Sequence, residues 1–528
     1  MLRQADAQAQ LLYNKHEYAQ AAAVLEAVRK QNPDVVLVPG WPNSLYNLAC
    51  YLAQAGNPDA ALAALGESVE DGSEVPAAQM GQDPDLVTLR GRPEFQSLVE
   101  TLERGQALWK DNPAIATAYK PILSEDEKIA GLSKFWSEAR FNFAGFSRHP
   151  GLDWDALYLS YLPRVRQART TADYYRVMMR FSAELHDGHS NAYPPKELVN
   201  TFYAKPGLRT AMVEGRVVIT QVVDPALRAQ GWKVGDVILK IGDLDVRQYA
   251  KLNVIPYQSS STSQDLDVRA FNYFLLSGDV HRTLTLTVED ASGRHSVRTL
   301  KRLPSAKIGA LFNAPGAKFR MLPGGIAYLE VGEFEDDSGP KALIAHLGEI
   351  AAAKGLVIDV RHNGGGNSQN GITILQVLAE SPFKWQMERT PVYNAVDRAD
   401  GIPQHLAALP QPDFAPDPTH HLSVPVVVLT SAETFSAAED FVALFQSMHR
   451  GPIIGEPTGG STGQPFSFKL PGGGSARICT KDTRTPDGRV YMGIGIQPDI
   501  LIRPSIADVR ANRDATLERA VQYLSTVH

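Results

Sequence analysis

The chain has 528 residues, of which 44% are hydrophobic and 21% charged, and this balance excludes disorder over most of its length. At ~100–200 residues per domain, the length predicts about three to four domains. The net charge of -6 argues against a nucleic-acid partner, and no apolar run reaches the ~18 residues of a membrane helix.

Two features bear on the cellular compartment. The two cysteines, Cys50 and Cys479, are too few for a disulfide scaffold or a cysteine-ligated zinc site. Met1 is followed directly by helical sequence rich in Ala and Gln, without an export signal. The protein is therefore expected to be cytoplasmic, or to be exported with a signal that this sequence lacks.

Residues 1–118 are predicted to form paired helices. Apolar residues recur at helical spacing from Tyr18 to Val28, and Pro33 ends the run. The small residues Ala21 and Ala61, forty positions apart, allow two helices to approach closely. This segment resembles tetratricopeptide repeats, whose period is about 34 residues, with an insertion between the pairs. An unrelated helical bundle is the alternative.

The next two segments differ in pattern. Residues 119–203 are mainly helical and run into the segment Leu185 to Ser190, where Gly188 is expected to end a helix. Residues 204–305 favour strands, and the segment Gly231 to Ile241 places a glycine turn before an apolar strand. This second segment resembles a PDZ domain.

Residues 306–528 alternate strands and helices, which is typical of an α/β domain. The predicted strands are 326–331, 355–360 and 424–429, with helices over 342–353 and 437–446. Three glycines follow the second strand in Asp359 to Gly366, so the backbone there can present N–H groups to a ligand. The loop lacks the Gly-Lys-Ser/Thr ending of a phosphate-binding loop.

A serine follows the third strand. Ser436 stands at the start of the next helix, where it is either an N-cap in a capping box with Glu439 or a hydroxyl exposed on a strand-to-helix elbow. In the second case, the following N–H and the helix dipole stabilise an oxyanion.

Four ordered motifs resemble those of the C-terminal-processing peptidases, serine peptidases that include the tricorn protease core. They are Asp359 to Gly366, Ser436 to Glu439, Gly455 to Thr458, and Gly495 to Asp499. The resemblance covers about residues 120–528 and implies a multidomain α+β protein. Its parts are helical repeats (1–118), a helical bundle (119–203), a PDZ-like β domain (204–305) and an α/β peptidase core with a ClpP/crotonase-like sheet (306–528).

The resemblance also implies roles for individual residues. Ser436 is the nucleophile, and the oxyanion hole consists of the N–H groups of Ala437 and of Gly365 or Gly366. One branch of the family uses a lysine as base, but Ser461 stands at its position. The tricorn-like branch uses a histidine before the PDZ domain, which His189 matches.

The chain departs from the tricorn-like pattern at two positions. Gly188 replaces a serine before the histidine, and Met492 replaces the glutamate that orients it. Asp187, Glu456 and Asp482 are the candidates for an orienting acid, with Glu456 preferred. We expect Met492→Glu to raise kcat, and activity to rise with pH through one ionisation near about 6–7.

The resemblance implies a serine endopeptidase that hydrolyses extended or C-terminal protein segments, needs no cofactor or metal, and is exported to the periplasm or cell surface. Its partners are a protein or peptide substrate and a protein bound by the repeats, and oligomers are compatible with it. Three alternatives stay open: a metal site at His186, Asp187 and His189; a scaffold built on the repeats and PDZ-like domain; and an inactive binding protein. The last has a precedent in interphotoreceptor retinoid-binding protein, which has the same fold.

Overall fold

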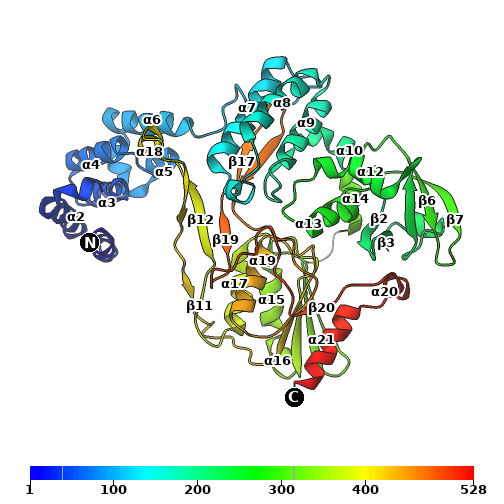
Figure 1. The fold of residues 1–528 in the computed structure, drawn as a ribbon. Helices are drawn as coiled ribbons and strands as arrows, with labels where there is room; N and C mark the ends of the chain where they lie inside the picture. The colour runs from blue at the N-terminus through cyan, green and yellow to red at the C-terminus, as the bar shows by residue number, and fades with distance from the viewer. Residues whose placement is uncertain (38–39, 313–315, 528) are drawn as a thin grey trace. The chain divides into compact units, whose positions relative to one another are not determined.

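The computed structural model describes residues 1–37, 40–312 and 316–527. The chain divides into two compact units, Met1–Ala114 and Ile115–His528 (Figure 1). In the described residues, no helix is long and apolar enough to cross a membrane. Each unit has its own hydrophobic core and is described separately.

The first unit is entirely helical in its described residues. Its central helix α3 is apolar on nearly every side and packs between α2 and α4, where Ala21 and Ala61 are completely buried. Trp41, Leu45 and Leu65 fill the core. The helices are α1 (Leu2–Tyr13), α2 (Tyr18–Gln31), η1 (Pro33–Leu37), α3 (Trp41–Gln54), α4 (Pro58–Glu70), α5 (Ala77–Gln82), η2 (Pro84–Leu89) and α6 (Pro93–Ala107). Paired helices are thus present, while their assignment to tetratricopeptide repeats stays a prediction.

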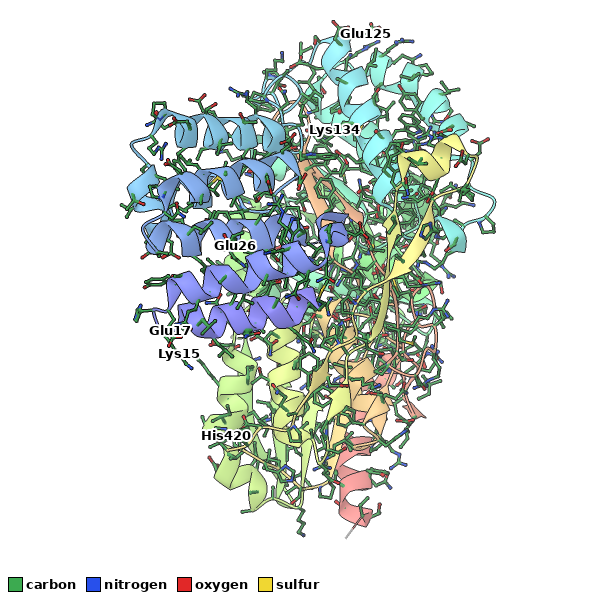
Figure 2. All side chains as sticks on the ribbon, turned by 90° about the vertical axis from the view of Figure 1, so that its left-hand side faces the viewer. Lys15, Glu17, Glu26, Glu125, Lys134 and His420 are labelled. Atoms are coloured by element: carbon green, nitrogen blue, oxygen red, sulfur yellow. The ribbon has the colours of Figure 1, made fainter. Side chains whose placement is uncertain are left out.

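The second unit opens with a helical layer of α7 (Glu125–Asn142), α8 (Trp154–Gln167) and α9 (Thr171–Ala183), with η3 (Phe146–Arg148) between the first two. Ser124 and Thr170 begin α7 and α9 with capping boxes. Figure 2 shows the side chains along α7, from Glu125 at its start to Lys134, which pairs with Glu138 at 3.5 Å.

The helical layer shares its core with a distant part of the chain. Phe135 and Phe181 pack against Phe468 and Ile478 from a three-stranded sheet in the order β1-β18-β17. These strands are β1 (Asn191–Tyr193), β17 (Pro465–Lys469) and β18 (Ser475–Cys479). The segment after α9 is thereby fixed against the C-terminal part of the chain.

The β-rich region contains a sheet in the order β2-β3-β4-β6-β7, and β5 pairs with β4. Its strands are β2 (Leu208–Val213), β3 (Arg216–Val222), β4 (Val237–Ile241), β5 (Leu244–Asp245), β6 (Leu284–Glu289) and β7 (His295–Leu300). Its helices are η4 (Lys196–Leu198), α10 (Val199–Phe202), α11 (Pro225–Ala229), α12 (Val246–Asn253), η5 (Ile255–Tyr257), α13 (Ser263–Asp267) and η6 (Val268–Tyr273). The turn before β4 lies where the sequence places it, and the PDZ-like assignment stays a prediction.

The α/β region has a six-stranded sheet in the order β20-β16-β15-β10-β9-β8, parallel except for β8. Its strands are β8 (Ala317–Leu322), β9 (Ile326–Val331), β10 (Gly355–Asp359), β15 (Val426–Thr430), β16 (Ile453–Gly455) and β20 (Ile500–Leu501). Its helices are α14 (Ser305–Phe312), α15 (Ser338–Ala345), α16 (Leu347–Ala351), α17 (Ser368–Leu378), α19 (Ala437–Ser447), α20 (Ile506–Ala511) and α21 (Ala515–Thr526). The helix expected over 342–353 is divided at His346 into α15 and α16.

Both faces of this sheet are covered by helices. Alternate residues of β9, β10 and β15 pack against α15, α17 and α19 on one face and against α21 on the other (Figure 1). Burial on both faces explains why these strands read as continuous apolar runs. Because β10 and β15 are parallel neighbours, the loops after them, which hold the glycine triplet and Ser436, meet at one edge.

A further set of short elements lies between β10 and β15 in sequence. They are β11 (Phe383–Lys384), β12 (Met387–Val392), α18 (Ala395–Ala399), β13 (His405–Ala408) and β14 (Asp413–Phe414). The β12–β13 hairpin pairs with β19 (Asp482–Arg484).

Candidate active site

Ser436 lies on a strained elbow between β15 and α19. Its φ of 58° is a left-handed conformation that residues other than glycine rarely adopt. Ser436 occupies the N-cap position of α19, but its side chain makes no capping hydrogen bond, so the capping alternative does not describe its side chain. Its Oγ lies 3.0 Å from Nε2 of His189 instead. The elbow therefore presents the hydroxyl to a base.

His189 lies far from Ser436 in the sequence, on the buried segment between α9 and β1. Its backbone N–H donates to Oδ1 of Asp187 at 2.9 Å, and its ring stacks on Phe435 with centroids 4.8 Å apart. The ring is almost fully buried, with 3% of the residue exposed. For Nε2 to accept the Ser436 proton, Nδ1 has to carry the ring hydrogen and donate it to an acceptor.

Ser461 provides this acceptor. Its Oγ lies 2.8 Å from Nδ1 of His189, and its carbonyl accepts the N–H of Ser436 at 3.1 Å. Ser461 is completely buried. The sequence indicates at this position only the absence of the lysine base, and the contact with His189 follows from the course of the loop.

Glu439 holds the Ser461 loop in place. Its carboxylate accepts the N–H groups of Gly460 (2.7 Å) and Ser461 (2.8 Å) and the hydroxyl of Thr458 (2.5 Å). Complete burial raises its pKa to about 8. The Glu439 side chain thus reaches across to this loop, and the capping box expected with Ser436 is absent.

The preferred orienting acid, Glu456, is elsewhere. Its nearest charged neighbour is Arg503 at 3.8 Å, whereas Nδ1 of His189 is taken by Ser461. Met492, which stands at the position of the expected glutamate, is buried in the core of the helical layer, and its Sδ accepts the N–H of Thr483. The expectation that Glu456 orients the histidine is therefore corrected.

The other two candidate acids have structural partners. Asp482 is held by the guanidinium groups of Arg148 (2.8 Å) and Arg389. Asp187 touches His189 through the backbone N–H rather than the ring, and it also accepts the hydroxyl of Ser190 at 3.0 Å. Asp187 thus fixes the course of the segment that carries His189.

The loop after β10 places Gly365 against Ser436 and Gly366 against the backbone of Phe334 and Glu335. A side-chain carbon added at Gly365 would lie 2.6 Å from Cβ of Ser436, and one at Gly366 would lie 2.4 Å from the backbone of Glu335. The Gly365 N–H already donates to Oδ1 of Asn363 at 2.9 Å. The N–H groups of Gly366 and Ala437 have no acceptor in the described part of the chain. The N–H groups of Gly366 and Ala437 are thus not engaged within the described residues, and Gly365 provides the close approach to Ser436.

The charge state of His189 follows from its surroundings. Burial, and then the positive charges of Arg477 and Arg269, hold its pKa well below 6.5. The imidazole is therefore neutral at physiological pH, which is the form that accepts a proton. This corrects the expectation of an ionisation near about 6–7.

A metal site at His186, Asp187 and His189 was the alternative interpretation. Both ring nitrogens of His189 are occupied by the hydroxyls of Ser436 and Ser461. The His186 ring lies 5.7 Å from that of His149 instead. The three residues therefore do not converge on one ion.

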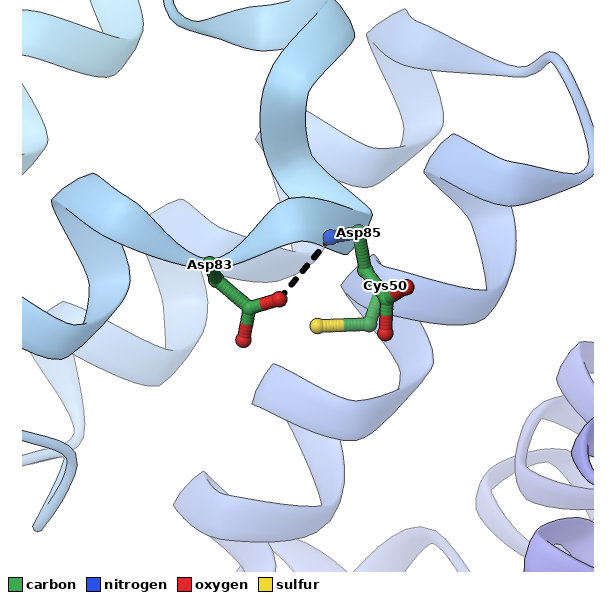
Figure 3. Close-up of side chains that lie close together, drawn as sticks. All are labelled: Cys50, Asp83 and Asp85. Atoms are coloured by element: carbon green, nitrogen blue, oxygen red, sulfur yellow. Dashed lines mark hydrogen bonds between the residues drawn. The ribbon is translucent and has the colours of Figure 1, made fainter.

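Among the described residues, one group brings three candidate ligand atoms within 4.8 Å of one another: Cys50, Asp83 and Asp85 of the helical unit (Figure 3). Asp83 caps η2 through the Asp85 N–H and accepts from Tyr46, while Asp85 accepts from Tyr13. Burial raises the pKa of the Cys50 thiol, so the thiolate that a metal requires is disfavoured. Helix capping accounts for this group.

Comparison with known proteins agrees with the motifs. Residues 325–502 match the model of peptidase family S41. A carboxyl-terminal-processing protease of Synechocystis is 26% identical over 204 residues, 38% of this chain and 44% of the relative. The chloroplastic C-terminal processing peptidase of Tetradesmus obliquus is 22% identical over 371 residues, 67% of this chain and 73% of that one. The chain thus spans less than half the length of the first relative.

A solved structure extends the comparison to the fold. Mature CPAF complexed with lactacystin superimposes with a TM-score of 0.60 at 15% identity, covering 76% of this chain and 97% of that one. At this identity the likeness concerns the fold alone. Together with the family match, it accounts for the α/β sheet and for the helices and strands around it. Residues 325–502 therefore match peptidase family S41, and the chain is similar to C-terminal-processing peptidases, as the motifs indicate.

Proposed function

We propose that the protein is a serine endopeptidase that hydrolyses peptide bonds in extended or C-terminal protein segments. The observation that carries the proposal is the pair of Ser436 and His189, brought from positions 247 residues apart to a distance of 3.0 Å. A hydroxyl is a weak nucleophile and needs a base at hydrogen-bond distance. The strained backbone of Ser436 is further support, because such strain is concentrated at functional sites.

In the proposed mechanism, Oγ of Ser436 attacks the carbonyl carbon while Nε2 of His189 takes its proton. The negative charge on the carbonyl oxygen is stabilised by the N–H groups of Ala437 and Gly366. Nδ1 of His189 keeps its hydrogen throughout and donates a hydrogen bond to Oγ of Ser461. The imidazolium then gives its proton to the leaving amine, and the acyl group stays on Ser436 until water, deprotonated by the same histidine, releases it.

A catalytically weak or inactive peptidase-fold binding protein is the second candidate. The observation that favours it is that Nδ1 of His189 contacts a hydroxyl rather than a carboxylate. A hydroxyl carries no charge to balance the imidazolium formed during attack. The base is nevertheless placed and oriented, which is why we prefer the enzyme.

Fluorophosphonate labelling separates the two candidates. The wild type is expected to be modified at Ser436, whereas Ser436→Ala is not, and His189→Ala reacts slower by orders of magnitude. Ser447→Ala, on the same helix, is the matched control and keeps the wild-type rate. A wild type that is not modified, with an intact fold by circular dichroism, would establish the binding protein instead.

We also propose that the β-rich region, 204–305, binds the C-terminal part of the substrate as an added strand, as PDZ domains do. The test compares cleavage of one peptide with a free and with an amidated C-terminus. Equal kcat/KM values would remove carboxylate capture from the proposal. We propose that the helical unit binds a protein partner. We also propose that the protein is exported to the periplasm, which cell fractionation tests.

A further inference from the structure

A cavity of about 290 Å³ lies beside the Ser436 elbow. Its walls come from α9, which contributes Met179, from β1 and Tyr203, from residues 257–274 of the β-rich region, and from the loops that hold the nucleophile and the glycines. Phe435 directly precedes Ser436, and Gly364 directly precedes Gly365. The cavity is thus built from neighbours of the reacting groups but is not part of the Ser436–His189 pair.

Aromatic side chains are the largest group among the lining residues. Six aromatic side chains line the cavity, and we call it the aromatic pocket: Tyr193, Tyr203, Tyr257, Tyr273, Phe274 and Phe435. A dry cavity of about 150 Å³ already holds benzene, so this volume admits a large aromatic or aliphatic side chain. Aromatic walls offer such a side chain extensive apolar contact.

The three charged residues in the lining are already paired. Asp265 and Arg269 form an ion pair at 2.8 Å. The carboxylate of Glu433 accepts from Asn272 at 2.7 Å and pairs with His362 at 3.0 Å. A charged side chain that entered would lose its hydration without gaining an unpaired opposite charge. The pocket therefore favours uncharged ligands.

The position of the pocket indicates which side of the scissile bond it serves. The leaving amine has to lie at Nε2 of His189, which gives it a proton. The pocket reaches Gly364 on the loop that carries Gly365 and Gly366, and the Phe435 ring that lines it stacks on the His189 ring. This position beside the glycine loop favours the side chain on the carbonyl side of the scissile bond.

We propose that the aromatic pocket receives the side chain of the acyl-side residue, so that the enzyme cleaves after large apolar residues. This inference rests on the proposed peptidase function. Burying phenylalanine rather than alanine in such a pocket corresponds to a preference of about 30- to 150-fold. Lysine and glutamate at this place react slowest.

The test uses peptidyl diaryl phosphonates that differ only in the acyl-side residue, which is Phe, Leu, Ala, Lys or Glu. The rate of Ser436 modification is followed by mass spectrometry, with a fluorophosphonate that has no peptide side chain as reference. The Phe and Leu reagents are expected to react at least about 30-fold faster than the Ala reagent. Similar rates for all five, with normal fluorophosphonate labelling, overturn the pocket inference alone, whereas absent fluorophosphonate labelling overturns the peptidase function and with it the inference.

Variants of the pocket test whether it causes the preference for the Phe reagent over the Ala reagent. Met179→Trp narrows the pocket from α9 and is expected to lower the ratio of the Phe-reagent rate to the Ala-reagent rate at least about tenfold. Met321→Trp, on an exposed position of β8 outside the pocket, is the matched control and changes neither rate. Tyr257→Ala enlarges the pocket, so a Trp reagent gains on the Phe reagent, and this second variant decides the case if Met179→Trp melts early. An unchanged ratio in a folded pocket variant overturns the inference.

Discussion

Replacing Ser461 by alanine removes the acceptor for Nδ1–H of His189 and leaves the nucleophile and the base in place. The contact is 2.8 Å long and fully buried, and during attack it is made by a charged imidazolium. Hydrogen bonds to charged groups contribute about 1.5–3 kcal/mol. If this energy is lost from the transition state, kcat falls about 10- to 150-fold. The backbone N–H and carbonyl of Ser461, which hold the loop and the elbow, are unaffected.

The assay is steady-state hydrolysis of a cleaved peptide together with the rate of fluorophosphonate labelling. Thr462→Ala is the matched control, because it removes a buried hydroxyl of the same loop that binds Asp440 rather than His189. It is expected to lower the melting temperature but to keep kcat within about twofold, since no group at the reaction centre changes. A Ser461→Ala variant with wild-type kcat, while Ser436→Ala is inactive, would refute the role of Ser461 in holding the tautomer.

Three further predictions concern the surroundings of the pair. The depressed pKa of His189 means that activity is lost only at a pH well below 6.5. Arg477→Gln removes a nearby positive charge and is expected to move this acidic limb of the kcat/KM profile to higher pH; a limb that does not move contradicts this. Gly188→Ser places a carbon about 2.8 Å from the Phe435 ring that stacks on the histidine, so labelling slows at least about tenfold, and an unchanged rate argues against this packing. Met492→Glu buries an unpaired carboxylate, so we expect it to lower the free energy of unfolding by about 2–4 kcal/mol, and with it the melting temperature, rather than to raise kcat. A variant that is stable and has a higher kcat would restore the original expectation.

The fold of the α/β region follows from local sequence. Short apolar runs such as Gly355–Asp359 and Val426–Thr430 favour strands covered on both faces, and helices between them favour parallel order. Parallel order places the loops after neighbouring strands at one edge. The meeting of the glycine loop with Ser436 was therefore predictable from the chain alone.

The partner of the imidazole was not predictable in this way. Ser461 was evident in the sequence only as the absence of a lysine, because its function depends on a loop that a buried carboxylate, Glu439, bends back to the elbow. Glu439 itself read as part of a capping box. Such contacts depend on where side chains point in the folded protein, and the spacing of residues along the chain does not indicate this.

The sequence by itself determined the chemistry: a hydroxyl on an elbow, glycines beside it, and a histidine in a matching segment. Tertiary structure decided how these groups are oriented and what surrounds them. In the tertiary structure, burial lowers the pKa of His189, and the Gly365 N–H donates to Asn363. The aromatic pocket forms where several distant segments meet. The physical reason is that local patterns specify strands, turns and helix ends, whereas desolvation and hydrogen-bond partners depend on residues far apart in the chain.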